Sequence, residues 1–177
     1  MDSLQPYILP LKGLGDGLHK FDFLIDGDFF RAFPDCPVEE GKVELKVTMD
    51  KRPRLLVFDF SFTGWVKSTC DRCLVPINLP ITGENRLLVK YGEAEDTVDD
   101  EDVVYIPLET SKWSLAQYAY EYVLLGLPII QVYACEEDEN PPCDFDTLDR
   151  LEGTGNDEAE ENPSNPFRDA FKDWNKE

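Results

Sequence analysis

Two runs of alternating apolar and polar residues, separated by a short turn, constrain this chain more than any other feature. Residues 43–49 alternate between the two classes, and residues 58–63 do the same with a phenylalanine at every second position. A period of two is typical of a half-buried strand. Residues 50–53 lie between the runs and include a proline, which favours a turn. The sequence therefore predicts an antiparallel hairpin with an aromatic inner face.

Further short segments have strand composition, and Gly, Pro or Asp residues separate most of them. They are residues 6–11, 19–25, 77–81, 86–91 and 102–107. Together with the hairpin they predict an α+β fold. Its core is expected to be a curled, partly barrel-like antiparallel sheet of about six strands.

One main helix is predicted to cover this sheet. Ser114 can cap its start with Gln117 in a capping box, while Trp113 and Tyr118 form a hydrophobic staple. Gly126 is expected to end it. Its apolar face consists of Leu115, Tyr118, Ala119, Tyr122 and Val123. A second, short helix is expected where three phenylalanines gather, namely Phe29, Phe30 and Phe33.

Composition divides the chain after residue 151. Residues 1–151 are expected to form a single domain. Residues 152–166 contain mostly Gly, Asn, Ser, Pro and acidic residues, so they cannot bury enough apolar surface to fold and predict an acidic, flexible linker. Residues 167–177 carry an apolar helical stripe, and so short a helix is expected to be ordered only when docked on a partner or on its own domain. The stripe consists of Phe167, Ala170, Phe171 and Trp174.

The start of the chain lacks the basic and apolar regions of a secretory signal. No window contains the roughly 18–20 consecutive apolar residues that span a bilayer. Five cysteines make a disulfide framework unexpected and favour reduced thiols or a metal site. These features predict a cytoplasmic protein with no membrane partner.

The net charge of −20 is unevenly distributed. Residues 42–90 contain nine bases and five acids, whereas residues 93–149 contain sixteen acids and one base. A strongly negative surface repels phosphate backbones and favours basic partners, although such charge can also serve only as solvated surface. Direct RNA contact is therefore expected only through the middle of the chain, where the candidate residues are Lys67, Arg72, Arg86 and Lys90.

Cys70 and Cys73 form a C-x-x-C element, whose spacing lets two thiolates share one tetrahedral zinc ion. Cys135 and Cys143 would complete a four-cysteine zinc site, although the seven residues between them exceed the usual spacing. The alternative is a structural turn with unmetallated thiols. A thioredoxin-like redox role is not expected, because residues 74–77 do not open a helix.

Motifs of catalysis are lacking. His19 is the only histidine and has no motif around it, and the chain has no G-x-S-x-G, phosphate-binding glycine loop or H-E-x-x-H. The sequence therefore favours a protein that binds other macromolecules over an enzyme.

The C-x-x-C element after an aromatic strand, followed by an amphipathic helix that runs into Leu127 and Pro128, resembles the YceD family of large ribosomal RNA subunit accumulation proteins. The resemblance covers residues 40–175. Residues 165–168 are similar to an Asp-Pro-Arg element near the end of family members. Many members carry a compact cysteine-rich group after the helix, whereas this chain has only Cys135 and Cys143 there.

The resemblance implies a non-enzymatic ribosome biogenesis factor, because the family is implicated in the accumulation of large-subunit ribosomal RNA and has no established enzymatic activity. Because the chain is strongly acidic, we expect its partner to be a basic ribosomal protein or assembly factor. Large-subunit ribosomal RNA is a further expected partner, through residues 42–90. Phe167, Phe171 and Trp174 are the partner-binding candidates of the tail. The alternatives are a zinc-dependent RNA-processing enzyme and an acidic chaperone of a basic ribosomal protein.

Overall fold

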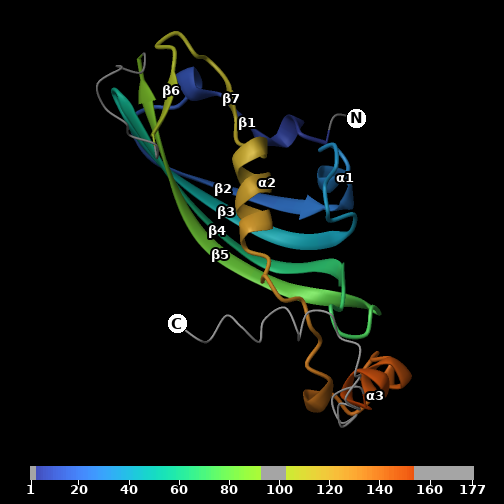
Figure 1. Ribbon diagram of the computed structural model, residues 1–177. Helices are drawn as coiled ribbons and strands as arrows, with labels where there is room; N and C mark the ends of the chain where they lie inside the picture. The colour runs from blue at the N-terminus through green and yellow to red at the C-terminus, as the bar shows by residue number, and fades with distance from the viewer. Residues whose placement is uncertain (1–2, 93–102, 154–177) are drawn as a thin grey trace, which may run out of the picture.

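The computed structural model describes residues 3–92 and 103–153 (Figure 1). Its centre is a five-stranded sheet in the order β2-β3-β4-β5-β6. These strands are β2 (Gly17–Asp26), β3 (Gly41–Arg52), β4 (Leu55–Thr69), β5 (Pro76–Tyr91) and β6 (Val103–Ile106). A second sheet consists of the two short strands β1 (Ile8–Leu9) and β7 (Trp113–Ser114).

The predicted aromatic hairpin is confirmed. Strands β3 and β4 pair antiparallel, with Met49 opposite Phe58 and Val47 opposite Phe60. All four side chains are buried, as is Phe62 two residues further along β4. Alternation therefore placed the correct face of both strands toward the core.

Strand β5 is a single strand of sixteen residues, whereas two separate strands were predicted there. It pairs with β4 from Pro76 to Lys90 without interruption. Gly83 lies in its middle, between the two segments predicted as separate strands. A Cβ atom at Gly83 would lie 2.4 Å from Cζ of Phe62, so this glycine makes room for the buried ring.

The expected antiparallel, partly barrel-like sheet also needs correction at its edge. Strand β6 pairs with β5 in parallel, with Val89 opposite Val104. In the described part of the chain, β2 and β6 are the two edges of an open sheet. The class α+β is correct, and the sheet is mixed and not closed.

The strand predicted over residues 6–11 is shorter in the structure. Only Ile8–Leu9 form a strand, and 3₁₀ turns flank it at η1 (Gln5–Tyr7) and η2 (Leu11–Gly13). Pro6 and Pro10 lack the N–H group that a longer ladder would require.

Helix α2 (Ala116–Leu125) lies across one face of the sheet (Figure 1). The predicted staple is present, because the rings of Trp113 and Tyr118 have centroids 5.2 Å apart. The capping box is absent. Gln117 Nε2 instead donates a hydrogen bond to Glu121 Oε1 at 2.7 Å. The Ser114 hydroxyl accepts a hydrogen bond from the Ala116 N–H at 3.3 Å, at the first residue of the helix, and the Leu115 N–H donates to the carbonyl of Tyr7 at 2.9 Å.

The opposite end of α2 packs against the aromatic core. Gly126 follows the last helical residue, as predicted. A Cβ atom there would lie 2.8 Å from the ring of Phe62, so both Gly83 and Gly126 make room for the same ring.

Helix α1 (Gly27–Phe30) confirms the predicted short helix. The carboxylate of Asp26 accepts hydrogen bonds from the backbone N–H groups of Asp28 and Phe29, which is ordinary N-capping. Phe33 follows the helix and stacks on Tyr120 of α2 with centroids 4.1 Å apart.

Helix α3 (Phe145–Gly153) and the 3₁₀ turn η3 (Cys135–Glu137) were not predicted. Asp144 precedes α3, and its carboxylate accepts hydrogen bonds from the N–H and hydroxyl of Thr147. Residues 152 and 153, assigned to the linker from composition, belong to α3. The rest of that linker and residues 167–177 lie outside the described residues. No helix of the described ranges is long and apolar enough to cross a membrane.

Candidate binding site at the cysteine turn

The turn between β4 and β5, residues 70–75, is here called the cysteine turn. Two backbone hydrogen bonds close it, from Cys70 N to Val75 O at 2.9 Å and from Leu74 N to Cys70 O at 2.8 Å. Leu74 has φ of 60°, in the left-handed region that is unfavourable for a leucine. Its side chain is 72% exposed. The contacts around the turn therefore hold Leu74 in a backbone conformation that is unfavourable for an isolated leucine.

Both thiols of the cysteine turn are free and buried, with Cys70 0% and Cys73 4% exposed. Burial acts to raise the pKa of Cys70. Hydrogen bonds to its sulfur from the backbone N–H groups of Cys73, Tyr133 and Arg72 act in the opposite direction and lower the pKa to about 7.

The chain that follows α2 returns to this turn. The Asp71 N–H donates to the carbonyl of Gln131 at 2.8 Å, and the Gln131 N–H donates to Asp71 Oδ2 at 2.6 Å. A third contact joins the side chains of Ser68 and Gln131. These reciprocal bonds fix residues 129–132 against the end of the sheet.

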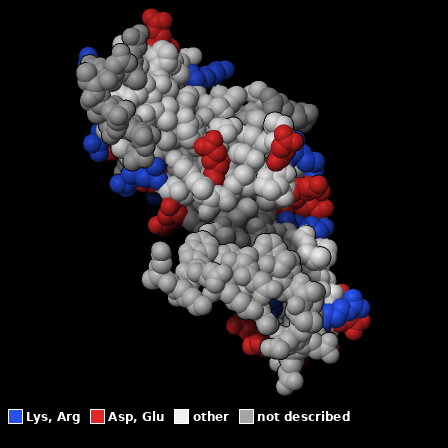
Figure 2. Space-filling view, in the orientation of Figure 1, with Lys and Arg blue, Asp and Glu red and all other residues white. Residues whose placement is uncertain are grey.

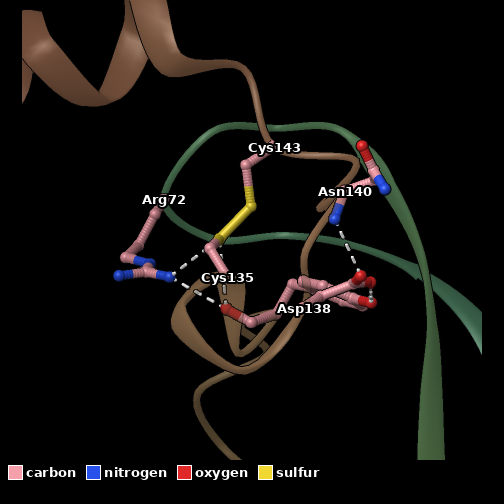
Figure 3. Close-up of a disulfide and its surroundings, with 6 residues drawn as sticks. Arg72, Cys135, Asp138, Asn140 and Cys143 are labelled. Atoms are coloured by element: carbon pink, nitrogen blue, oxygen red, sulfur yellow. Dashed lines mark hydrogen bonds between the residues drawn. A yellow bond between two sulfur atoms is a disulfide. The ribbon is translucent and has the colours of Figure 1, made fainter.

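Arg72 extends the contact toward the acidic part of the chain (Figure 3). Its Nη2 donates to the carbonyl of Tyr133 at 2.9 Å and lies 3.3 Å from Sγ of Cys135. Cys135 is bonded to Cys143 in a disulfide. Arg72, predicted as an RNA or partner contact, is therefore directed at a neighbouring segment of its own chain.

The four predicted zinc ligands are thus found at one end of the molecule. Cys143 is buried, as are Cys70 and Cys73. The disulfide between Cys135 and Cys143 differs from the reduced thiols or metal site favoured by the sequence. Across residues 3–92 and 103–153, no group of three or more Cys, His, Asp or Glu side chains is arranged to hold a metal ion.

Residues 129–132, here called the apolar segment, expose large side chains. Ile129 is 100% exposed, Ile130 is 68% exposed and Val132 is 39% exposed. Leu74 in the cysteine turn and Leu125 at the end of α2 are exposed as well. Contiguous exposed apolar residues often mark an interaction site. The apolar run after the predicted end of the helix could have signalled this surface.

Residues 136–149, here called the acidic segment, contain seven acids and no base. They include the last two residues of η3 and the start of α3, which lies beyond the cysteine turn in Figure 1. The carboxylate of Asp138 accepts hydrogen bonds from the Tyr133 hydroxyl at 2.5 Å and from the Asn140 N–H at 3.0 Å. The Tyr133 bond contributes most to holding the pKa of Asp138 below its usual value. This charge is present at neutral pH.

The basic candidates do not form one patch. Lys67 Nζ pairs with Glu40 at 2.9 Å, and Arg86 Nε pairs with Asp59 at 2.6 Å. Lys90 Nζ lies 6.0 Å from the centroid of the Tyr105 ring. Figure 2 shows basic side chains at separate places around the margin of the face that α2 covers.

The register of β4 and β5 explains this separation. Lys67 lies opposite Asn78, and Arg86 lies opposite Asp59. Eight residues of strand separate Asn78 from Arg86, a distance of roughly 26 Å at about 3.3 Å per residue. Lys67 and Arg72 therefore lie near the cysteine turn, whereas Arg86 and Lys90 lie toward the other end of the sheet.

Comparison with known proteins finds one family model that matches the chain. It is described as Large ribosomal RNA subunit accumulation protein YceD and matches residues 58–172. The match includes the cysteine turn, the apolar segment and the acidic segment. No curated protein and no solved structure matches the chain.

Proposed function

Since the chain belongs to the YceD family of large ribosomal RNA subunit accumulation proteins, we propose that it supports accumulation of large-subunit ribosomal RNA by binding a basic protein of the ribosome or of its assembly. The binding surface consists of the apolar segment together with the acidic segment. The observation that carries this proposal is the full exposure of Ile129 beside a run of seven acids.

The apolar segment supplies the anchor of this surface. Hydrogen bonds between Asp71 and Gln131 hold its backbone, so its exposed side chains are already positioned for a partner. Such preorganisation lowers the entropic cost of binding. Two hollows, of about 500 and 400 Å³, lie along the chain around residues 129–138. They can receive side chains of a partner, as buried anchors do at interfaces.

The acidic segment supplies complementarity and sets the kind of partner. A run of carboxylates without bases attracts Lys and Arg side chains and accelerates encounter with a basic surface. Ribosomal proteins and their assembly factors are rich in such surfaces, because they bind phosphate backbones. The same charge repels RNA from this end of the molecule.

Direct binding of RNA by this chain is not part of the proposal. Lys67 and Arg86 each have an acidic partner within 3 Å, so a phosphate would have to displace a carboxylate from them. Affinity for nucleic acid rises with the number of phosphates that free bases neutralise. We therefore assign the ribosomal role to contact with protein.

An acidic chaperone that shields a basic ribosomal protein before assembly would use the same surface. The two functions differ in the state of the partner. A chaperone releases its client before the client reaches RNA, whereas an assembly factor stays with a partner that is bound to the large-subunit precursor.

Affinity purification from growing cells tests the proposed surface. A variant with Ile129→Asp and Ile130→Asp should lose its basic partner, because an ionised carboxylate in place of the apolar anchor would have to be buried in the contact, which costs its hydration free energy. Leu108→Asp is the matched control, since Leu108 is also 68% exposed but follows β6, away from the cysteine turn. Recovery of the same partner by both variants would refute the surface.

The purified complex also separates the two functions. Co-purification of precursor large-subunit RNA through the partner, abolished by nuclease while the protein partner remains, supports an assembly factor. A complex that contains the basic protein without RNA supports a chaperone.

A further inference from the structure

Strand β2 forms a long edge of the central sheet. It pairs with β3 over all ten of its residues, from Gly17 to Asp26, in one unbroken register. The strand at the other edge, β6, has only four residues. Natural sheets often protect an edge with a proline, a bulge or a very short strand, and β2 has none of these. An edge of this kind can pair with a further strand.

Every second residue of β2 directs its backbone groups toward this edge. The Lys67 N–H donates to the Glu40 carbonyl at 2.8 Å and continues the register of β3 and β4 by one pair, so the even-numbered residues of β3 face β4. Antiparallel ladders alternate, so the odd-numbered residues of β3 face the odd-numbered residues of β2. The backbone groups that point away from β3 are therefore those of Leu18, Lys20, Asp22 and Leu24.

Contacts at this edge agree with that orientation. The Tyr7 hydroxyl donates to the Leu24 carbonyl at 3.1 Å, from outside the ladder with β3. Within residues 3–92 and 103–153, no hydrogen bond from beyond the edge reaches the backbone of Leu18, Lys20 or Asp22. Their side chains and that of Leu24 are exposed, with Leu18 at 71% and Leu24 at 52%. The edge is therefore accessible over most of its length.

The exposed side chains of β2 are complementary to themselves. If a second copy of β2 lies antiparallel with Phe21 opposite Phe21, then Lys20 lies opposite Asp22 and Leu18 lies opposite Leu24, each pair occurring twice. The same alignment brings even-numbered residues together, so their edge-facing N–H and C=O groups can form a ladder. Opposite charges and apolar pairs at such positions stabilise strand pairing. A parallel pairing in register would instead place like charges opposite each other.

The inner face of β2 adds an aromatic contact in this alignment. Phe21 and Phe23 are half-buried, with ring centroids 6.4 Å apart, and Tyr7 stacks on Phe23 at 4.8 Å. Phe21 would lie at the two-fold axis in a pair without hydrogen bonds, where opposite side chains approach most closely. The two Phe21 rings would then cover each other.

We propose that two copies of this chain form a symmetric dimer through β2, in which both five-stranded sheets become one continuous sheet. Each copy contributes the same edge, so the contact closes after two copies. The order of charged and apolar side chains selects a second copy over an unrelated strand. The apolar segment stays free for the basic partner, because Asp71 in the turn between β4 and β5 holds it, away from β2.

Sedimentation velocity of the full chain over a series of micromolar concentrations tests the proposal. The salt concentration is about 0.15 M, which screens the repulsion between two copies that each carry a net charge of −20. We expect the wild type to pass from monomer to dimer as its concentration rises. Lys20→Glu and Asp22→Lys each create two pairs of like charges and should each weaken the dimer roughly tenfold or more. Lys42→Glu is the matched control, since it reverses an exposed lysine on the neighbouring strand β3 and should leave the dimer unchanged.

A mixture of the two weakened variants separates the pairing from effects on folding. In a mixed dimer the two acids of Lys20→Glu face the two bases of Asp22→Lys, so an equimolar mixture should recover the dimer. Amide exchange at Leu18, Lys20 and Asp22 of the wild type should slow as the protein concentration rises. A wild type that stays monomeric would overturn the proposal and leave the edge to a strand of another protein. A dimer that neither reversal weakens, or a mixture no more dimeric than its components, would overturn it as well.

Discussion

Arg72 connects the two halves of the proposed binding site, because its guanidinium lies 3.3 Å from the sulfur of Cys135 and donates to the carbonyl of Tyr133. Arg72 belongs to the turn at the end of the long hairpin, and Cys135 belongs to the chain that follows α2. The contact therefore fixes the course of the chain between the apolar segment and the acidic segment.

Removal of the Arg72 side chain should loosen this connection. We expect Arg72→Ala to lower the free energy of unfolding by about 1 kcal/mol, because one net hydrogen bond is worth roughly 0.5–1.5 kcal/mol. Amide hydrogen exchange should accelerate in residues 129–135 while β3 and β4 remain protected. Arg31→Ala removes another exposed arginine and should leave exchange at residues 129–135 unchanged. Unaltered exchange in Arg72→Ala would show that the segment is held without it.

Gly83 is a position at which the core has no room for a side chain. Gly83→Ala should destabilise the protein by roughly 1–3 kcal/mol, as overpacking does, because the new methyl group meets the ring of Phe62. Urea denaturation measures the loss. Gly15→Ala is the control, since nothing lies within 4 Å of a Cβ atom there. The double variant Gly83→Ala with Phe62→Leu should be more stable than the sum of the single changes predicts, and strict additivity would contradict the proposed clash.

Helix α3 should depend on the carboxylate of Asp144. Its hydrogen bonds with Thr147 lower the pKa of Asp144, so the stabilisation is present above the pKa of the unfolded chain and is lost as pH falls through the lower, folded value. Asp144→Ala should therefore accelerate amide exchange in residues 145–151 at neutral pH, whereas Asp144→Asn, also a good N-cap residue, should do so less. Equal exchange in wild type and Asp144→Ala would refute the capping role.

Charge reversal on the sheet should have little effect on RNA binding. Lys67→Glu with Arg86→Glu removes two bases that already pair with acids, so the slope of log affinity against log salt should change by much less than one per residue. Fluorescence anisotropy with a large-subunit RNA fragment measures it. A decrease in slope of about two would show that both bases contact phosphates.

The sequence predicted those parts of the fold in which local pattern and tertiary structure agree. Alternation in residues 43–49 and 58–63 predicted both hairpin strands and their inner faces, and Trp113 with Tyr118 predicted the start of α2 to within a few residues. Strand β5 was predicted as two strands because a glycine between two apolar runs is compatible with a turn or with a close approach inside one strand, and only the position of Phe62 distinguishes the two. The parallel pairing of β6 depends on the path of the chain, which periodicity does not encode.

The site was predictable to a similar degree. The C-x-x-C spacing singled out Cys70 and Cys73 as zinc ligands, which stays a prediction, and the structure places Cys135 and Cys143 at the same end of the molecule. The disulfide was unexpected because five cysteines in a chain expected to be cytoplasmic favour reduced thiols, and because spacing in the sequence does not give the spatial proximity on which pairing depends. The basic candidates were grouped by position in the sequence, but the length of β4 and β5 separates Lys67 from Arg86.

The ratio of mature large-subunit to small-subunit ribosomal RNA in a strain that lacks this protein tests the central claim most directly. We expect the ratio to fall in the deletion strain and to be restored by the wild type and by Leu108→Asp at equal expression. The variant with Ile129→Asp and Ile130→Asp should fail to restore it, because the partner-binding anchor is lost. An unchanged ratio in the deletion strain would contradict the ribosomal role, and full restoration by the double variant would contradict the proposed surface.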